Sequence, residues 1–165
     1  MRFGDGHIHD TYRVTAHGGN YSDYILQRIN HEVFRDVPAL QSNIERVTSH
    51  IRAKLMAAGI DDIDRRILTL IPAAGGRSWC QDEDGNYWRL YLFIKDHRTY
   101  DFVDSPARAY QGGRAVGRFQ SLLSDLPYPP LHETIPRFHD VRWRMDNFRN
   151  AVVQDPEKQG CITAG

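Results

Sequence analysis

A strand-like heptapeptide followed by an amphipathic helix decides the fold of this 165-residue chain. The two segments are YILQRIN (residues 24–30) and DVPALQSNIERVTSHIRAKLMAAG (residues 36–59). The first is rich in residues that favour β-strands. In the second, Asp36 is a typical N-cap, Pro38 suits the first helical turn and Gly59 suits a helix end. Apolar residues recur at intervals of three and four, which predicts one buried helix face: Leu40, Ile44, Val47, Ile51 and Leu55.

Upstream of this stretch, the sequence predicts a second strand. Gly4-Asp5-Gly6 is a turn signal, and residues 7–14 carry apolar side chains with the period of two that is typical of a strand. Gly18-Gly19-Asn20 is another turn. Residues 7–14 and 24–30 are therefore expected to pair as a β-hairpin.

Downstream of the helix, residues 66–95 predict further strands. Residues 67–72 and 77–80 are separated by two glycines, and a turn at residues 82–86 precedes the alternating segment 87–94. One face of that segment is wholly apolar and is expected to meet the helix: Trp88, Leu90, Leu92 and Ile94. The other face is aromatic with one cation: Tyr87, Arg89, Tyr91 and Phe93.

Beyond residue 96 the pattern becomes helical, over residues 107–124 and again along an apolar stripe from Phe138 to Val152. Three glycines in the first helix suggest a close approach to another helix or to a ligand, or a break in the helix. Strands first and helices last predict an α+β fold with an antiparallel sheet. The expected organisation is a sheet domain over residues 1–96, a linker over 97–105, a helical region over 106–155 and a disordered tail over 156–165.

The composition disfavours several classes of protein. Lysine plus arginine and aspartate plus glutamate are both 21, and the formal net charge of zero is unlike that of a nucleic-acid binder. The longest apolar run is far shorter than the ~20 residues of a membrane helix, and no secretory signal is visible. Cys80 and Cys161 lack partners at metal-site spacing and are interpreted as free thiols in a reducing, cytoplasmic compartment.

Three features could bind a ligand. The glycine turn could bring backbone N–H groups to a phosphate, although most such turns are only turns and Asp5 repels phosphate. Arg28 could contact phosphate with Glu45 as its orienting partner, or could reach solvent from a strand edge. His7 and His9 alternate on one strand, but no third ligand is evident, so surface histidines are favoured over a metal site.

Six blocks, in chain order, resemble those of one family. They are FGDGHIHDTY (3–12), YILQRIN (24–30) followed by VF (33–34), NI (43–44), YWR (87–89), GRFQ (117–120) and ETIPRFHD (133–140). From Phe3 to about Asp155 the chain thereby resembles the N-acetylhexosamine 1-kinase-like branch of the aminoglycoside phosphotransferase and choline kinase group. That group shares the protein-kinase fold and transfers the γ-phosphate of ATP, with Mg²⁺, to a small molecule. In this branch the acceptor is the anomeric hydroxyl of GlcNAc or GalNAc.

The resemblance implies roles for particular residues. Residues 1–96 would be the nucleotide-binding N-lobe, 97–105 the hinge or linker, and 106–155 the first helices of a helical C-lobe. The sequence departs from the family's pattern at His9, where Asn is usual, and at Asp5, where a small neutral residue is usual. The implied nucleotide contacts are Gly4, Asp5, Gly6 and His7 over the phosphates, Arg28 at the α- and β-phosphates with Glu45 as its ion-pair partner, and Phe93, Ile94 and Lys95 at the adenine edge.

Phosphoryl transfer in this fold also needs an aspartate that accepts the hydroxyl proton, in an H-x-D-x-x-x-x-N loop, and an aspartate that binds Mg²⁺. No segment of the sequence fits either role, so we expect both beyond residue 165 and expect this chain to be inactive by itself. The expected ligands are ATP and an amino sugar, with the Mg²⁺ ligands in the missing part. The alternatives are a non-catalytic nucleotide- or partner-binding module, self-associating through the exposed apolar surface of the last helices, and an α+β domain without a ligand.

Overall fold

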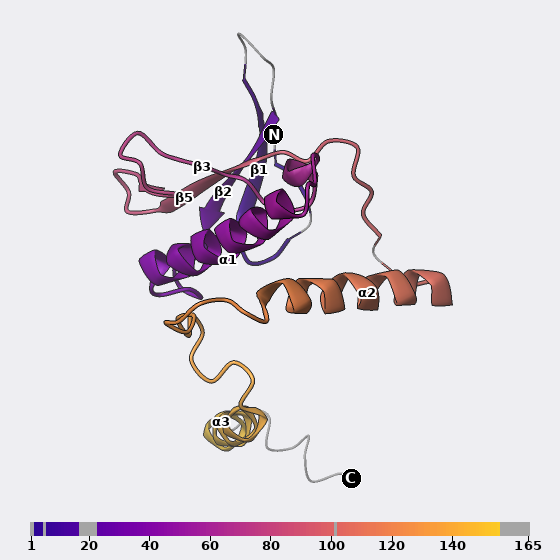
Figure 1. The fold of residues 1–165 in the computed structure, drawn as a ribbon. Coiled ribbons are helices and arrows are strands. Elements are labelled where there is room, and N and C mark those ends of the chain that lie inside the picture. The colour runs from indigo at the N-terminus through magenta and orange to yellow at the C-terminus, as the bar shows by residue number, and fades with distance from the viewer. Residues whose placement is uncertain (1, 5, 17–22, 101, 156–165) are drawn as a thin grey trace. The chain divides into compact units, whose positions relative to one another are not determined.

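The computed structural model describes residues 2–4, 6–16, 23–100 and 102–155 (Figure 1). Within them, five strands form one antiparallel sheet, accompanied by three α-helices and one short 3-10 helix, so the predicted α+β class is confirmed. The predicted tail, the turn at residues 18–20, Asp5 and Cys161 lie outside the described residues. The elements are β1 (Asp10–Thr15), β2 (Asp23–Ile29), α1 (Val37–Ala57), η1 (Ile63–Arg65), β3 (Leu70–Ile71), β4 (Cys80–Gln81), β5 (Tyr87–Leu92), α2 (Pro106–Leu123) and α3 (Val141–Gln154).

The predicted hairpin is confirmed by the pairing of β1 with β2. The two strands run antiparallel, and Asp10 lies opposite Arg28. Before β1, the amide of Phe3 donates a hydrogen bond to the carbonyl of Thr11 at 2.8 Å, so the chain reverses between Phe3 and β1. Gly4, in this reversal, has a φ of 76°, a backbone conformation that glycine adopts without strain.

β5 is the strand around which the rest of the sheet is built. The strand order is β1-β2-β5-β3, and β4 also pairs with β5. β2 pairs with β5 from Tyr24 opposite Leu92 to Ile29 opposite Tyr87. The strands expected at residues 67–72 and 77–80 are only two residues long each, as β3 and β4.

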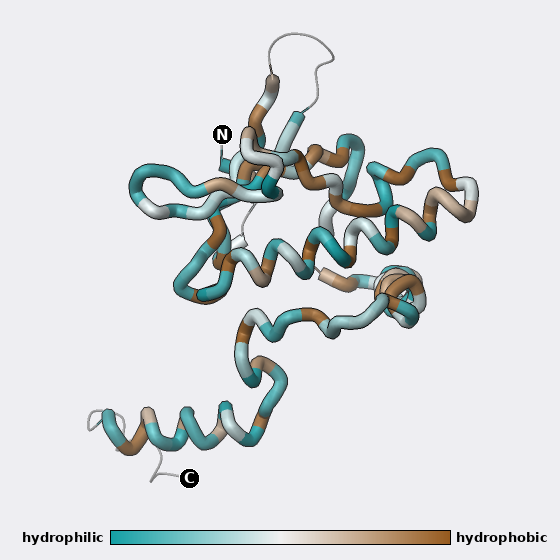
Figure 2. The backbone as a smooth tube through the Cα atoms, turned by 60° about the vertical axis from the view of Figure 1, so that its left-hand side comes forward, coloured by the Kyte–Doolittle hydropathy of each residue, from teal (hydrophilic) through white to brown (hydrophobic). Residues whose placement is uncertain are grey.

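α1 begins and ends close to the predicted residues. The side chain of Asp36 accepts a hydrogen bond from the amide of Ala39 at 2.9 Å, and Pro38 lies in the first turn. Apolar residues recur among polar ones along the helix, as Figure 2 shows. The buried face is rotated from the predicted stripe, because Leu40, Ile44 and Val47 are only half-buried. The buried residues of α1 are Val37, Gln41, Thr48, Ile51 and Leu55.

The face of β5 that joins the core is not the predicted one. Arg89 and Tyr91 are 8% and 7% exposed, whereas the apolar residues between and beside them are half-buried. The strand register places Arg89 and Tyr91 on the same face as Ile29, and α1 covers this face (Figure 1). The expectation that the wholly apolar face meets the helix is therefore wrong. The buried apolar core is Ile29, Val37, Ile51, Leu55 and Tyr91.

α2 is a continuous helix that packs beside α1. The break and the close helix–helix approach expected from its three glycines are absent among the described residues, since a β-carbon at Gly112, Gly113 or Gly117 would meet none of their atoms within 4 Å. Among the described residues, no helix is long and apolar enough to cross a membrane.

By its packing the chain divides into two compact units, Met1–Thr134 and Ile135–Gly165. The first holds the sheet, α1 and α2; the second holds α3, whose N-cap is Asp140. No residue of α3 is buried, and Met145 and Phe148 are 44% and 59% exposed. The lobe boundary expected at residues 97–105, and self-association through the last helices, stay predictions.

Candidate functional site

Four of the expected nucleotide contacts line two different cavities, whereas Gly4, Gly6 and Lys95 line neither of them. His7 and Arg28 line a polar cavity of about 330 Å³ at the end of β2. Phe93 and Ile94 line a second, mainly apolar cavity of about 550 Å³ beside β5. The set predicted from the sequence therefore does not form one continuous site.

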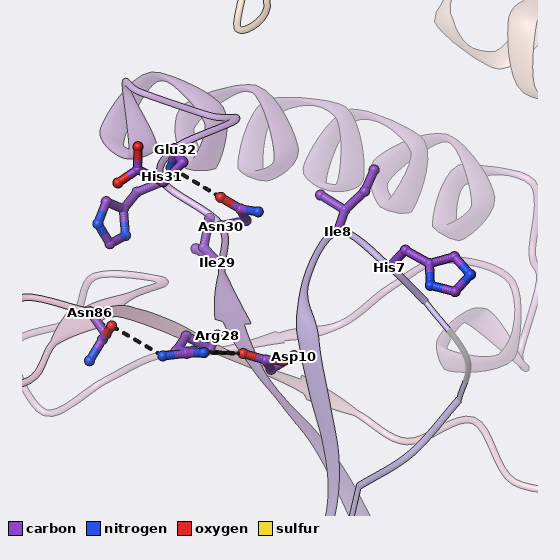
Figure 3. Close-up of a pocket in the computed structure, with 9 residues that line it drawn as sticks. All are labelled: His7, Ile8, Asp10, Arg28, Ile29, Asn30, His31, Glu32 and Asn86. Atoms are coloured by element: carbon purple, nitrogen blue, oxygen red, sulfur yellow. Dashed lines mark hydrogen bonds and ion pairs between the residues drawn. The ribbon is translucent and has the colours of Figure 1, made fainter.

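In the polar cavity, Arg28 is held by Asp10. Its Nε donates to Asp10 Oδ2 at 2.7 Å, a second bond joins Nη2 to the same oxygen, and Nη1 donates to Asn86 Oδ1 at 3.4 Å (Figure 3). These contacts with Asp10 raise the pKa of Arg28. Asp10 also pairs with Arg2 at 3.7 Å, and Glu32 lines the same cavity, so two carboxylates balance two guanidinium groups and the local charge does not favour a phosphate.

The ion pair expected between Arg28 and Glu45 is not formed. Arg28 lies opposite Asp10 in the sheet and on the other face from Ile29, the residue of β2 that contributes to the core with α1. Glu45, on α1, lines a different cavity. The period-2 alternation of strand side chains therefore separates the two residues that the sequence analysis paired.

The second cavity opens on the face of the sheet that carries Arg89. Its apolar and aromatic lining includes Ile25, Tyr91 and Phe93. Its polar groups are on Gln27 and Arg89. Phe3 adds another aromatic side chain, with its ring centroid 5.6 Å from that of Phe93. A flat apolar molecule with one anionic group would match such a lining.

Arg89 is the buried cation of this cavity. Its Nε and Nη2 donate to Gln27 Oε1 at 2.9 and 2.6 Å, and Gln27 Nε2 donates to Thr11 Oγ1 at 2.9 Å. Among the described residues, Arg89 Nη1 has no hydrogen-bond partner, although it is shielded from solvent. Burial lowers the pKa of Arg89, but a guanidinium stays charged at neutral pH. The wall of this cavity therefore includes a buried positive charge, one of whose donors has no partner among the described residues.

His9 lies close enough to Arg89 to respond to its charge. Burial, and then the positive charge of Arg89, lower the pKa of His9 and favour the neutral imidazole. His9 Nδ1 accepts a hydrogen bond from the amide of Asn30 at 3.0 Å, and the ring stacks on Phe34 at 5.4 Å. The expectation of two surface histidines thus holds for His7, which is exposed, but not for the half-buried His9.

The segment after β5 is held by one backbone hydrogen bond and by two side chains that donate to its carbonyl groups. The amide of Phe93 donates to the carbonyl of Asp23 at 2.9 Å, and His97 Nδ1 donates to the carbonyl of Ile94 at 2.6 Å. Arg65 Nη1 donates to the carbonyl of Lys95 at 2.7 Å. Phe93 and Ile94 line the cavity, whereas Lys95 is exposed and is not part of the lining.

Arg89 is the one cation of its strand face, and neither the motifs nor the resemblance gave it a role. A signal was available, because a cation between two aromatic residues on one face of a strand is expensive to bury without a partner. Within the described ranges, no group of three His, Cys, Asp or Glu side chains could hold a metal ion. No known protein-family model matches this chain.

Proposed function

We propose that this chain binds a nucleotide in the cavity that Arg89 and Phe93 line, as the nucleotide-binding part of a small-molecule kinase. The observation that carries the proposal is the buried guanidinium of Arg89 with Nη1 unpartnered among the described residues, at the wall of an apolar cavity. An adenine ring would pack between Ile25 and Phe93, and a phosphate would accept a hydrogen bond from Nη1.

Two physical arguments support a negatively charged group at Arg89. Leaving a buried donor without a partner costs about 1–3 kcal/mol, which a ligand's acceptor would recover. A hydrogen bond between two charged groups is also about twice as strong as one between neutral groups. In this proposal Arg89 takes the role that the resemblance had given to Arg28.

The resemblance to N-acetylhexosamine 1-kinases makes ATP the nucleotide and GlcNAc or GalNAc the phosphoryl acceptor. The described residues do not fit a Mg²⁺ site, since they bring no three suitable ligands together. We therefore derive only nucleotide binding from this chain's own residues. Phosphoryl transfer from the bound nucleotide would also need the proton-accepting and Mg²⁺-binding aspartates, and no segment of this sequence fits those roles.

Isothermal titration calorimetry with ATP, ADP and AMP tests the proposal. We expect Arg89→Gln to weaken ATP binding at least tenfold, which corresponds to about 1.4 kcal/mol, and Arg89→Lys to weaken it less. Arg28→Gln is the matched control, because it removes an arginine from the opposite face of the sheet. Circular dichroism and thermal melts verify that each variant is folded. Equal affinity in Arg89→Gln and the parent protein would refute the site.

A coupled ADP-release assay with GlcNAc and GalNAc distinguishes a chain that only binds the nucleotide from a chain that is itself a kinase. We expect ATP to bind without turnover above background. Sustained ADP release by these 165 residues would show that the chain is itself a kinase and would contradict the expectation that its catalytic groups are elsewhere. If ATP, ADP and AMP all failed to bind, both the nucleotide-binding proposal and the kinase alternative would be refuted.

A further inference from the structure

A further cavity lies between α1 and α2, which pack beside each other. It has a volume of about 300 Å³, at the lower end of the range for ligand-binding cavities, and suits a ligand of about ten heavy atoms. The two helices are joined next to it, because Lys54 Nζ donates to the carbonyl of Leu122 at 3.0 Å. Neither Arg89 nor Phe93 lines this cavity, so it is separate from the proposed nucleotide site.

The floor of the cavity is apolar, and its mouth is exposed. Ile51 and Leu55, from the buried face of α1, are 2% and 4% exposed, and Ile67 adds further aliphatic surface. On α2, Phe119 is 47% exposed, and Arg118 beside it is exposed as well. A hydrocarbon chain could therefore be buried at one end while a polar group at its other end stayed in contact with water.

Within the described residues, two guanidinium groups and no carboxylate line the cavity. Arg66 Nε donates to Asp62 at 2.6 Å, whereas Arg118 makes no hydrogen bond or ion pair with any described residue. The positions three and four residues from Arg118 on α2 hold no acidic side chain. Asp62 and Asp125, which do not line the cavity, are already paired with cations. The local charge therefore favours an anion at Arg118.

We propose that this cavity binds a monocarboxylate with an apolar chain of about six to eight carbon atoms. Its carboxylate accepts hydrogen bonds from the guanidinium of Arg118 at the mouth, and its chain lies against Ile51, Leu55 and Phe119. Arg66 adds a second positive charge to the lining. The ligand is bound and not transformed. The proposal does not depend on nucleotide binding, because it uses none of the residues of that site.

Amide chemical shifts of the full ¹⁵N-labelled chain test this site with three probes of equal chain length. Hexanoate carries the anion, 1-hexanol has no charge and hexylamine carries a cation. We expect hexanoate to shift the amides of Ile67 and Ala115 in a saturable way, 1-hexanol to bind about fivefold more weakly and hexylamine to produce no saturable shift. Equal affinities for hexanoate and either of the other probes, or no saturable shift with hexanoate, would overturn the proposal.

The length of the chain tests the apolar floor. We expect hexanoate to bind about fivefold more tightly than butanoate, because two more CH₂ groups leave water. Equal affinities for butanoate and hexanoate would contradict burial of the chain, since they would indicate that only the carboxylate is recognised.

Two substitutions assign the contacts. Arg118→Gln should lower the affinity for hexanoate to that for 1-hexanol, and Arg114→Gln, one turn earlier on α2 and outside the lining, is the matched control and should change neither. Ala115→Trp, which fills the cavity from α2, should remove the binding of both probes. Thermal melts verify that each variant is folded. Unchanged affinity for hexanoate in Arg118→Gln would refute the site.

Discussion

A single position along a strand decides which arginine is available to a ligand. Arg28 and Arg89 lie on neighbouring strands but on opposite faces of the sheet. Arg28 is paired with the carboxylate of Asp10, directly across the hairpin, whereas Arg89 donates to the neutral amide of Gln27 and pairs with no carboxylate in the described part of the chain. The strand-like segment around Arg28 predicts a ligand contact there, but the strand register leaves Arg28 beside a carboxylate and Arg89 without one.

The burial of Gln41 also follows from its position on α1, and it supports a prediction about stability. It is 1% exposed, and neither atom of its amide group has a hydrogen-bond partner within the described ranges. Since an unsatisfied buried polar group costs about 1–3 kcal/mol, Gln41→Met should stabilise the protein by about 1 kcal/mol. Thermal melts should then show a Tm higher by about 2–4 °C.

Gln41→Ala is the control for this prediction, because it removes the amide and also leaves a cavity. We expect it to lower the Tm relative to Gln41→Met. If Gln41→Met melted below the parent protein, the amide would have to be bonded, for example to a buried water, and our assessment of Gln41 would be wrong.

At the scale of elements, α1 organises the chain well beyond the sheet. Asn43 Nδ2 donates to the carbonyl of His132 at 2.8 Å, and the amide of His132 donates back to Asn43 Oδ1 at 2.8 Å. Arg46 donates to the carbonyls of Pro127, Pro129 and Pro130. Two side chains of one helix thus hold the backbone of the proline-rich segment after α2.

Asn43→Ala should release that segment. We expect a loss of about 1–2 kcal/mol in the free energy of unfolding, because two hydrogen bonds are removed together. Hydrogen exchange at the amide of His132 should accelerate, and urea titration should report the lower stability. Ser42→Ala, at the neighbouring position, is the control and should leave exchange at His132 unchanged. Unaltered protection of His132 in Asn43→Ala would disprove this role of Asn43.

At the scale of the whole molecule, Asp125 helps to join α2 to α1. Its carboxylate accepts hydrogen bonds from Lys54 and, at 3.1 Å, from His50 Nε2, both on α1. The bonds from Lys54 and His50 lower the pKa of Asp125 to about 2. A carboxyl group whose pKa is lower in the folded protein stabilises the fold above its unfolded pKa and loses that effect as the pH falls.

We therefore expect the contribution of Asp125 to be complete above about pH 4 and to disappear as the pH falls towards 2. Urea unfolding of the parent protein and of Asp125→Asn should differ at pH 6 and converge near pH 2. Asp84→Asn, in the exposed turn before β5, serves as the control and should follow the parent protein. A difference that stays constant from pH 6 to pH 2 would contradict the role of the ionised carboxylate.

The fold was largely predictable wherever the signal was local. The N-cap at Asp36, the period of α1, the hairpin of β1 and β2 and the helices after residue 105 follow from capping, periodicity and turn residues. The glycines of α2 misled the prediction, because a glycine can lower helix propensity without marking any contact. β3 and β4 are shorter than predicted, because strand length depends on pairing with partners that are distant in the sequence.

The amino-acid sequence by itself determined the order and type of the elements, because helix capping and hydrophobic periodicity act over a few neighbouring residues. Only the tertiary structure decided which face of β5 enters the core, since a strand has two faces and its register across β2 selects between them. That selection buries Arg89 beside Tyr91 and leaves Arg28 with Asp10. The candidate sites follow from it, because the availability of a charge depends on burial and on partners brought from distant segments.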